Sequence, residues 1–265
     1  MELWRRLDAD FLMPSRLGEY ARLLDTLLEH RYEVVSIAEF WARHGAGSTE
    51  PHRRYVLLRH DVDTGLETAR RMLETERAHG VRCTSYYFRL GTLDTGLMRE
   101  IAAGGGEAGY HYEELATLVK QRRPASRAAA LECIPDAQEA FRRNIERIRA
   151  QTGLPIRIVA SHGDFANRAV GVPNWKILED AEFRASAGVD LEVYDDALVR
   201  HVTSRHSDTA PPRCWIPADP VPGTADSPEV MYLLVHPRHW HVDRRANAVD
   251  DVRRVWEGVR YRWGV

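Results

Sequence analysis

The chain lacks an apolar run of the roughly twenty residues that a membrane-spanning helix needs. It also lacks the pattern of a secretory signal, because Asp8 and Asp10 stand where an apolar segment and a cleavage site would be. Charge of one sign is not in excess, since 37 Lys and Arg residues oppose 39 Asp and Glu residues for a net charge of −2. We therefore expect a cytoplasmic protein that binds neither nucleic acid nor a membrane. Nothing in the sequence indicates its oligomeric state.

Cysteine is scarce as well. The three cysteines, Cys83, Cys133 and Cys214, are far apart in the sequence and form no CxxC pair. This spacing argues against a disulfide framework and indicates reduced thiols. The 265 residues show no internal repeat, and we expect one domain over residues 1–265.

Helical and strand patterns alternate along the chain, which predicts an α/β fold. The expected strands cover residues 32–37, 55–58, 82–88, 107–111, 157–160 and 231–235. The expected helices cover residues 15–29, 64–79, 96–103 and most of 112–152, with a short one near 39–42 and a closing one that carries Ala248, Val252, Val255, Trp256 and Val259. Prolines break up residues 170–228, where we expect loops and short strands.

The strand that begins at Tyr55 ends in polar residues, His60, Asp61 and Asp63. Reacting groups of α/β folds gather at the carboxyl ends of parallel strands, so this end is a candidate active site. A capping box over residues 64–67 would explain Asp63 as a helix-terminal charge. It would not explain two neighbouring carboxylates and an imidazole, which need a cation or proton to offset their repulsion.

Three further histidines follow predicted strands in the same way, namely His111, His162 and His236. A single histidine at such a position is more often structural than functional. Four strand ends with the same chemistry instead indicate a shared site that contains the two aspartates.

Four motifs in this order resemble the polysaccharide deacetylase superfamily, also called the NodB-homology or carbohydrate esterase family 4 group. They are Arg-His-Asp-Val-Asp at 59–63, Gly-Glu-Ala-Gly-Tyr-His-Tyr-Glu at 106–113, Ser-His-Gly at 161–163 and Leu-Val-His-Pro at 234–237. The resemblance covers roughly residues 15–260. It implies a distorted (β/α) barrel of about seven parallel strands, a divalent cation and hydrolysis of an acetamido group.

The same resemblance implies roles for single residues. Asp61 would be the general base, Asp63 and His111 would be metal ligands, and His236 would be the general acid. The valine between Asp61 and Asp63 departs from the family's adjacent aspartates, so these two roles could be exchanged.

A second departure concerns the metal. The family's second motif has two histidines four residues apart, but Leu115 stands four residues after His111. We expect His162 to be the third ligand, with Glu114 and His60 as weaker candidates. Aspartate and histidine ligands favour Zn²⁺, with Mn²⁺, Co²⁺ or Fe²⁺ as alternatives, over Mg²⁺ or Ca²⁺.

The expected function is metal-dependent removal of an acetyl or similar acyl group from an amide nitrogen of a sugar or small-molecule intermediate. For substrate binding we name Trp175 and Trp240 as stacking faces and Arg238 as a partner for an anionic group. Two other hypotheses remain: hydrolysis of a different C–N bond, and a metal-free barrel that serves as a binding module.

Overall fold

The computed structural model describes residues 11–45, 53–209, 213–220 and 229–263. Its strands are β1 (Glu33–Val35), β2 (Arg54–Val62), β3 (Ser85–Phe88), β4 (Glu107–Tyr112), β5 (Ile158–Ser161), β6 (Leu191–Glu192), β7 (Ser204–Asp208), β8 (Trp215–Ile216) and β9 (Glu229–Val235). Its α-helices are α2 (Leu17–Glu29), α3 (Ile37–His44), α4 (Leu66–Ala78), α5 (Thr95–Ala103), α6 (Glu114–Arg122), α7 (Arg127–Leu131), α8 (Ile134–Thr152), α9 (Phe165–Val170), α10 (Ala181–Ser186), α11 (Asp196–Val199) and α12 (Arg244–Trp263). Short 3₁₀ helices are η1 (Leu90–Thr92), η2 (Asn174–Leu178) and η3 (Pro237–His239). No helix in these ranges is both long and apolar enough to cross a lipid bilayer.

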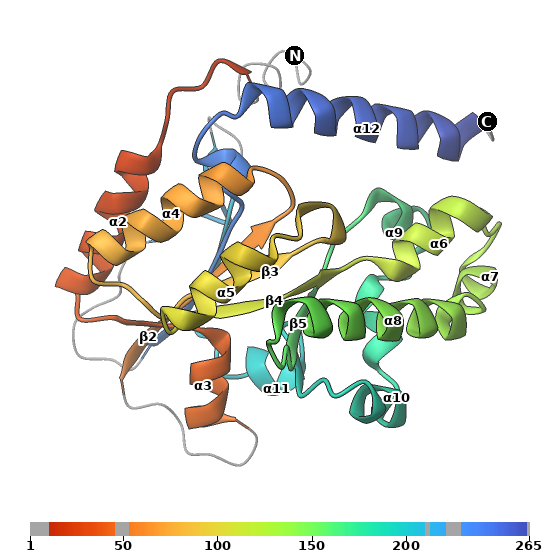
Figure 1. Cartoon of the computed structure of the whole chain (residues 1–265), viewed down its shortest axis with the longest axis horizontal. Helices are drawn as coiled ribbons and strands as arrows, with labels where there is room; N and C mark the ends of the chain where they lie inside the picture. Colours follow the sequence, from red (N-terminus) through yellow and green to blue (C-terminus); the bar gives the residue numbers. More distant parts are fainter. Residues whose placement is uncertain (1–10, 46–52, 210–212, 221–228, 264–265) are drawn as a thin grey trace.

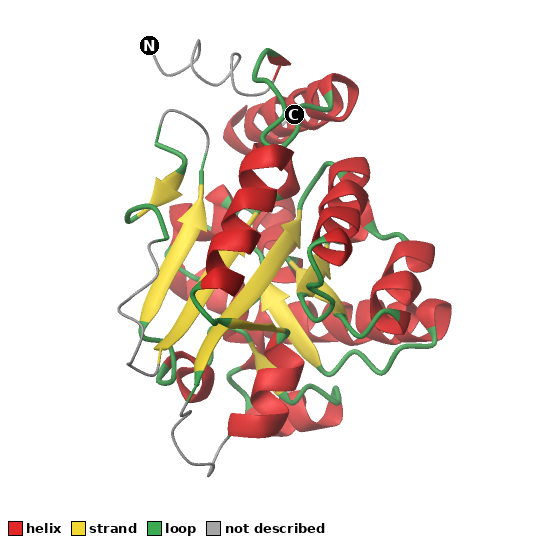
Figure 2. Cartoon of the chain, turned by 90° about the vertical axis from the view of Figure 1, so that its left-hand side faces the viewer, coloured by secondary structure: helices red, strands yellow, loops and turns green. Residues whose placement is uncertain are grey.

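The strands form one sheet in the order β6-β5-β4-β3-β2-β9-β7-β8, and β1 also pairs with β2. Among the described residues every pairing is parallel except that of β7 with β8. The sheet is curled into a half-barrel, with helices packed around it (Figures 1 and 2). The predicted α/β, barrel-like class is therefore confirmed.

Strand β2 lies at the centre of the sheet, and all nine of its residues are buried. Residues alternate between the two faces of a strand. Val56 and Leu58 pack with α2 and α4, whereas Tyr55 and Leu57 belong to a separate core that includes residues of α3 and α11. This burial on both faces explains why the sequence of β2 is a continuous apolar run rather than an alternating one.

The turn after β2 leads directly into helix α4. Helix α4 begins at Leu66 after Gly65, whose backbone is left-handed (φ 71°), and no side chain caps it. This contradicts the alternative explanation of Asp63, in which residues 64–67 form a capping box. Asp63 is consequently not needed to cap this helix.

Most apolar residues of helix α12 do not pack into the core, although their helical spacing in the sequence is typical of a buried face. Its valines and tryptophan, which repeat at helical spacing, face outward, with Val252 71% and Trp256 58% exposed. Ion pairs attach α12 to the rest of the protein, including Lys120 with Glu257 (3.0 Å) and Arg238 with Asp250 (2.6 Å).

Candidate active site

The two aspartates lie at the carboxyl end of β2, Asp61 within the strand and Asp63 directly after its last residue, Val62. Asp61 shares its face of the strand with Arg59, whose guanidinium donates to both carboxylate oxygens at 2.6 Å. Burial alone would raise the pKa of Asp61, but Arg59 and then His111 lower it below its ordinary value. Asp61 is thus held as a carboxylate in a fixed orientation.

His60 points to the opposite face of β2. Its Nε2 lies 2.8 Å from Glu76 Oε1 and 2.9 Å from the hydroxyl of Tyr20, and its ring stacks on Tyr86 with centroids 3.9 Å apart. All of these side chains are buried. His60 therefore belongs to a polar network beneath α2 and α4, and its candidacy as a metal ligand is wrong.

His111 lies at the end of β4 and points toward both aspartates. Its Nδ1 is 3.0 Å from the carbonyl oxygen of Ala160, and its Nε2 is 3.4 Å from Asp61 Oδ2 and also 3.4 Å from Asp63 Oδ1. Burial lowers the pKa of His111 to about 4. The ring is therefore neutral, with Nε2 available as a ligand when Nδ1 donates to the backbone.

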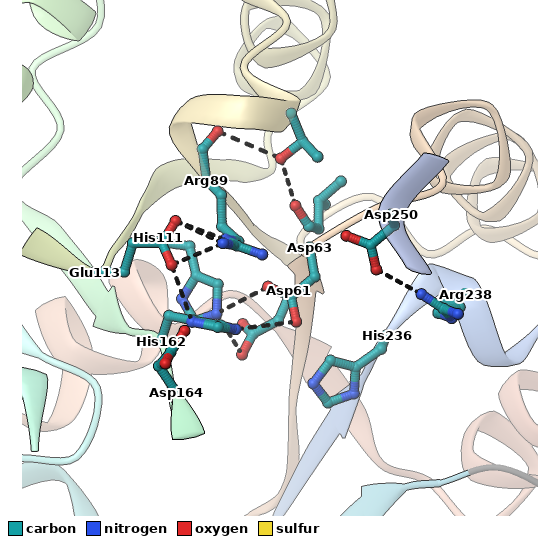
Figure 3. Close-up of polar contacts among 12 residues, drawn as sticks. Asp61, Asp63, Arg89, His111, Glu113, His162, Asp164, His236, Arg238 and Asp250 are labelled. Atoms are coloured by element: carbon teal, nitrogen blue, oxygen red, sulfur yellow. Dashed lines mark hydrogen bonds and ion pairs between the residues drawn. The ribbon is translucent and has the colours of Figure 1, made fainter. Parts of the chain in front are cut away.

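His162 follows β5, and its ring lies beside that of His111, on the same side of Asp63 (Figure 3). Its Nε2 is 3.6 Å from Asp63 Oδ2, and its Nδ1 is 3.5 Å from Glu113 Oε2. Burial opposes protonation, but Asp63 and Glu113 raise the pKa of His162 to about 9. Glu113 is in turn held by Arg89, at 2.6 Å and 2.7 Å.

These side chains fit a divalent cation. Ligand atoms of Asp63, His111 and His162 all lie within 4.8 Å of one another. Asp63 Oδ1 is buried, forms no hydrogen bond with the described residues and lies 3.4 Å from His111 Nε2, so an acceptor remains available beside that imidazole. One carboxylate and two imidazoles form a donor set that suits Zn²⁺ and similar borderline cations.

Glu114, the other weaker candidate, is directed elsewhere. Its Oε1 accepts hydrogen bonds from the Tyr110 hydroxyl and from Asn144 Nδ2, the latter at 2.8 Å. Burial raises the pKa of this carboxyl group. Glu114 thus packs between β4 and α8 rather than in the site, and its candidacy is also wrong.

His236 follows β9, and its partner was missed in the sequence. His236 Nδ1 is 2.6 Å from Asp208 Oδ1, at the end of β7. Burial lowers the pKa of His236, but Asp208 outweighs it and raises the pKa to about 9. Asp208 lies at a strand end, as the other site residues do. However, the strand Ser-Arg-His-Ser-Asp is polar throughout and gives no hydrophobic signal.

Two of the three residues predicted to bind substrate are engaged within the protein. Trp240 is only 2% exposed, and its Nε1 donates to Asp208 Oδ2 at 2.8 Å, so it has no free face for a sugar. Arg238 forms ion pairs with Asp250 (2.6 Å) and Asp251 (2.8 Å). Their placement corrects both expectations: Trp240 orients Asp208, and Arg238 anchors α12.

Trp175 lies on η2 and is 38% exposed, so a face remains available for contact. A separate cavity of about 540 Å³ reaches Asp63 from the side of α12. Arg89, Gly91 and Thr92 line it on one side, and Ala246 and Val249 of α12 line it on another. Of the candidate metal ligands, Asp63 is the one that lines this cavity.

No family model matches the chain, and no curated protein matches it. The chain is similar to a solved structure described as a mutant of a CE4 family pseudoenzyme with restored enzymatic activity, at 16% identity and a TM-score of 0.39. The match covers 77% of this chain and spans 62% of the length of that one, less than two thirds.

Proposed function

We propose that this protein is a metal-dependent amide hydrolase that removes an acetyl or similar acyl group from the nitrogen of a sugar or small molecule. The observation that carries the proposal is the convergence of Asp61, Asp63, His111 and His162 from three strand ends, with atoms 3.4–3.6 Å apart. His236 joins the same edge of the sheet at the end of β9, which pairs with β2. Amide hydrolysis needs a base, an oxyanion-stabilising group and an acid, and these residues supply or hold all three.

Asp63, His111 and His162 would hold the cation, with Zn²⁺ proposed first and Mn²⁺, Co²⁺ or Fe²⁺ as alternatives. When bound, such a cation polarises the amide carbonyl and makes water a better nucleophile near neutral pH. Exchange of the two aspartate roles is less favourable. Asp61 has both oxygens bound by Arg59, whereas Asp63 presents an oxygen without a hydrogen bond.

Asp61 takes the proton of the attacking water. Arg59 keeps this carboxylate ionised and fixes its orientation. His236 gives a proton to the departing amine, because Asp208 holds its Nδ1 and leaves Nε2 directed away from that contact. The two proton transfers therefore belong to separate strands, β2 and β9.

The test is acetate release from a panel of N-acetylated sugars and sugar nucleotides, measured before and after metal removal and after re-addition of single cations. We expect turnover that needs the cation and falls at least about a hundredfold in His236→Gln. Preferential turnover of cyclic or linear amides would favour hydrolysis of another C–N bond. A protein that binds no cation and turns over nothing would favour the binding module.

Aromatic contact with the substrate is tested separately. Trp175→Ala should raise KM for a sugar substrate while leaving kcat and metal content unchanged, if the exposed ring stacks on the sugar. An unchanged KM would remove Trp175 from the binding site without affecting the proposed chemistry.

A further inference from the structure

A second group of possible ligands lies between the ends of β7 and β9. Asp208 Oδ1 is 2.6 Å from His236 Nδ1 and 3.2 Å from His239 Nδ1. Ligand atoms of these three residues all lie within 4.8 Å of one another. None of the three is among the residues proposed above as metal ligands.

The carboxylate at this group is already oriented. Asp208 Oδ2 accepts the backbone N–H of His236 and the indole N–H of Trp240, both at 2.8 Å. Burial would raise the pKa of Asp208, but His239 and His236 lower it below its ordinary value. Oδ1 is therefore presented as a fixed anionic ligand toward the two imidazoles.

His239 supplies the observation that points to a ligand. Its Nδ1 is shielded from solvent and forms no hydrogen bond within the described part of the chain, although Asp208 Oδ1 is only 3.2 Å away. Two ligand atoms of a tetrahedral zinc site are about 3.3 Å apart, given metal–ligand bonds of about 2.0–2.1 Å. The 3.2 Å separation of His239 Nδ1 from Asp208 Oδ1 is close to this ligand–ligand distance.

We propose that Asp208, His236 and His239 form a second cation site, which takes Zn²⁺ or a similar borderline cation through one carboxylate oxygen and two Nδ1 atoms. The side chains of His236 and His239 are each 24% exposed, so water can complete the coordination. His236 Nδ1 must move apart from Asp208 Oδ1 by several tenths of an ångström to admit the ion. This second site is therefore weaker than the first.

Occupation of this site inhibits the protein, and this consequence rests on the proposed function. The cation takes the lone pair of His236 Nδ1 and displaces the Nδ1 proton to solvent. The ring then keeps only its Nε2 proton and is a neutral imidazole ligand, which is too weak an acid to protonate the departing amine. Excess cation consequently blocks the step that His236 performs while the first site stays filled.

Zn²⁺ binding to the metal-stripped, full-length protein tests the site by equilibrium dialysis, without any substrate. We expect the wild type to bind two equivalents of Zn²⁺, one tightly at the first site and one weakly at the second. His239→Ala should bind one equivalent and lose only the weakly bound ion. Asp63→Asn should lose the tightly bound ion and keep the weakly bound one. His241→Ala, a neighbouring histidine outside the group, is the matched control and should keep both.

A single equivalent in the wild type would overturn the proposal, as would a second equivalent that persists in His239→Ala or disappears in His241→Ala. If a substrate is found, excess Zn²⁺ should inhibit the wild type at least about tenfold more strongly than His239→Ala. Equal inhibition of both would overturn the inhibitory role. Because stoichiometry is read without turnover, the absence of hydrolase activity and the absence of this site give different results.

Discussion

Arg59 and Asp61 lie two residues apart on one strand and bind each other through both guanidinium–carboxylate contacts, Nε to Oδ1 and Nη2 to Oδ2, each 2.6 Å long. Their side chains are 0% and 4% exposed. Residues at i and i+2 share one face of a strand, so the strand itself creates this pair. Strand β2 therefore carries both the proposed base, Asp61, and its counter-ion, Arg59.

Replacement of Arg59 by methionine should destabilise the fold strongly. The substitution leaves the Asp61 carboxylate buried without its counter-ion, and breaking a buried pair in this way costs about 3–5 kcal/mol. Urea unfolding followed by circular dichroism measures the change. Arg157→Met is the matched control, because its pair with Asp190 lies at the surface and should contribute little. Equal effects of the two substitutions would contradict this account.

The third metal ligand can be decided by two substitutions. His162→Ala should lower the affinity for Zn²⁺ at the tighter site by at least about tenfold, because a direct ligand is lost. Glu114→Gln should leave the affinity unchanged, since that carboxyl group contacts Tyr110 and Asn144 instead. Competition with a chromophoric chelator gives both values. A larger loss in Glu114→Gln would reverse the assignment.

Glu113 should influence the metal without touching it. Its carboxylate lies 3.5 Å from His162 Nδ1 and is held by Arg89, so it fixes the ring with Nε2 toward Asp63. Loss of such a supporting contact typically weakens metal binding by about 10–100-fold. We expect Glu113→Gln to show this loss by chelator competition, whereas Glu257→Gln, which removes a part-buried partner of Lys120 that does not contact His162, should not.

The alkaline limit of activity should depend on Asp208. His236 must be protonated to act as the acid, so activity falls as the pH rises through its pKa of about 9. Asp208→Asn removes the anion that raises this pKa, and the alkaline limb of kcat/KM should move from about 9 toward the ordinary 6.5. An unmoved limb would show that His236 is not the titrating acid. Asp190→Asn, at a distant exposed ion pair, is the control.

Much of the fold follows from the sequence because the central strands are buried on both faces. The run from Tyr55 and the β-forming segment before Phe88 both become strands of the sheet. The short strands β6, β7 and β8 lie within residues 170–228, where short strands and loops were expected but no strand bounds could be predicted. They contain two to five residues, and β7 is polar throughout, so no hydrophobic period marks them.

The part of the candidate site that lies at strand ends could be predicted from the sequence. His111 and His162 converge on Asp63 because parallel neighbours end at the same edge of the sheet. Contacts between side chains could not be predicted, because no pattern in the sequence indicates what Trp240 and Arg238 bind. Only packing shows that Trp240 holds Asp208 and that Arg238 binds α12. The same limit applies to the outward-facing valines of α12.

The pairing of β2 with β9 joins residues 175 positions apart, as Arg54 and Glu229 show. During synthesis, the strand that carries Asp61 therefore leaves the ribosome long before its neighbour exists. Until residues 229–235 emerge, one side of that strand exposes unpaired backbone groups, which are prone to association with other nascent chains. The carboxylate of Asp61 and the imidazole of His236 are therefore brought to one edge of the sheet only after residues 62–235 have left the ribosome.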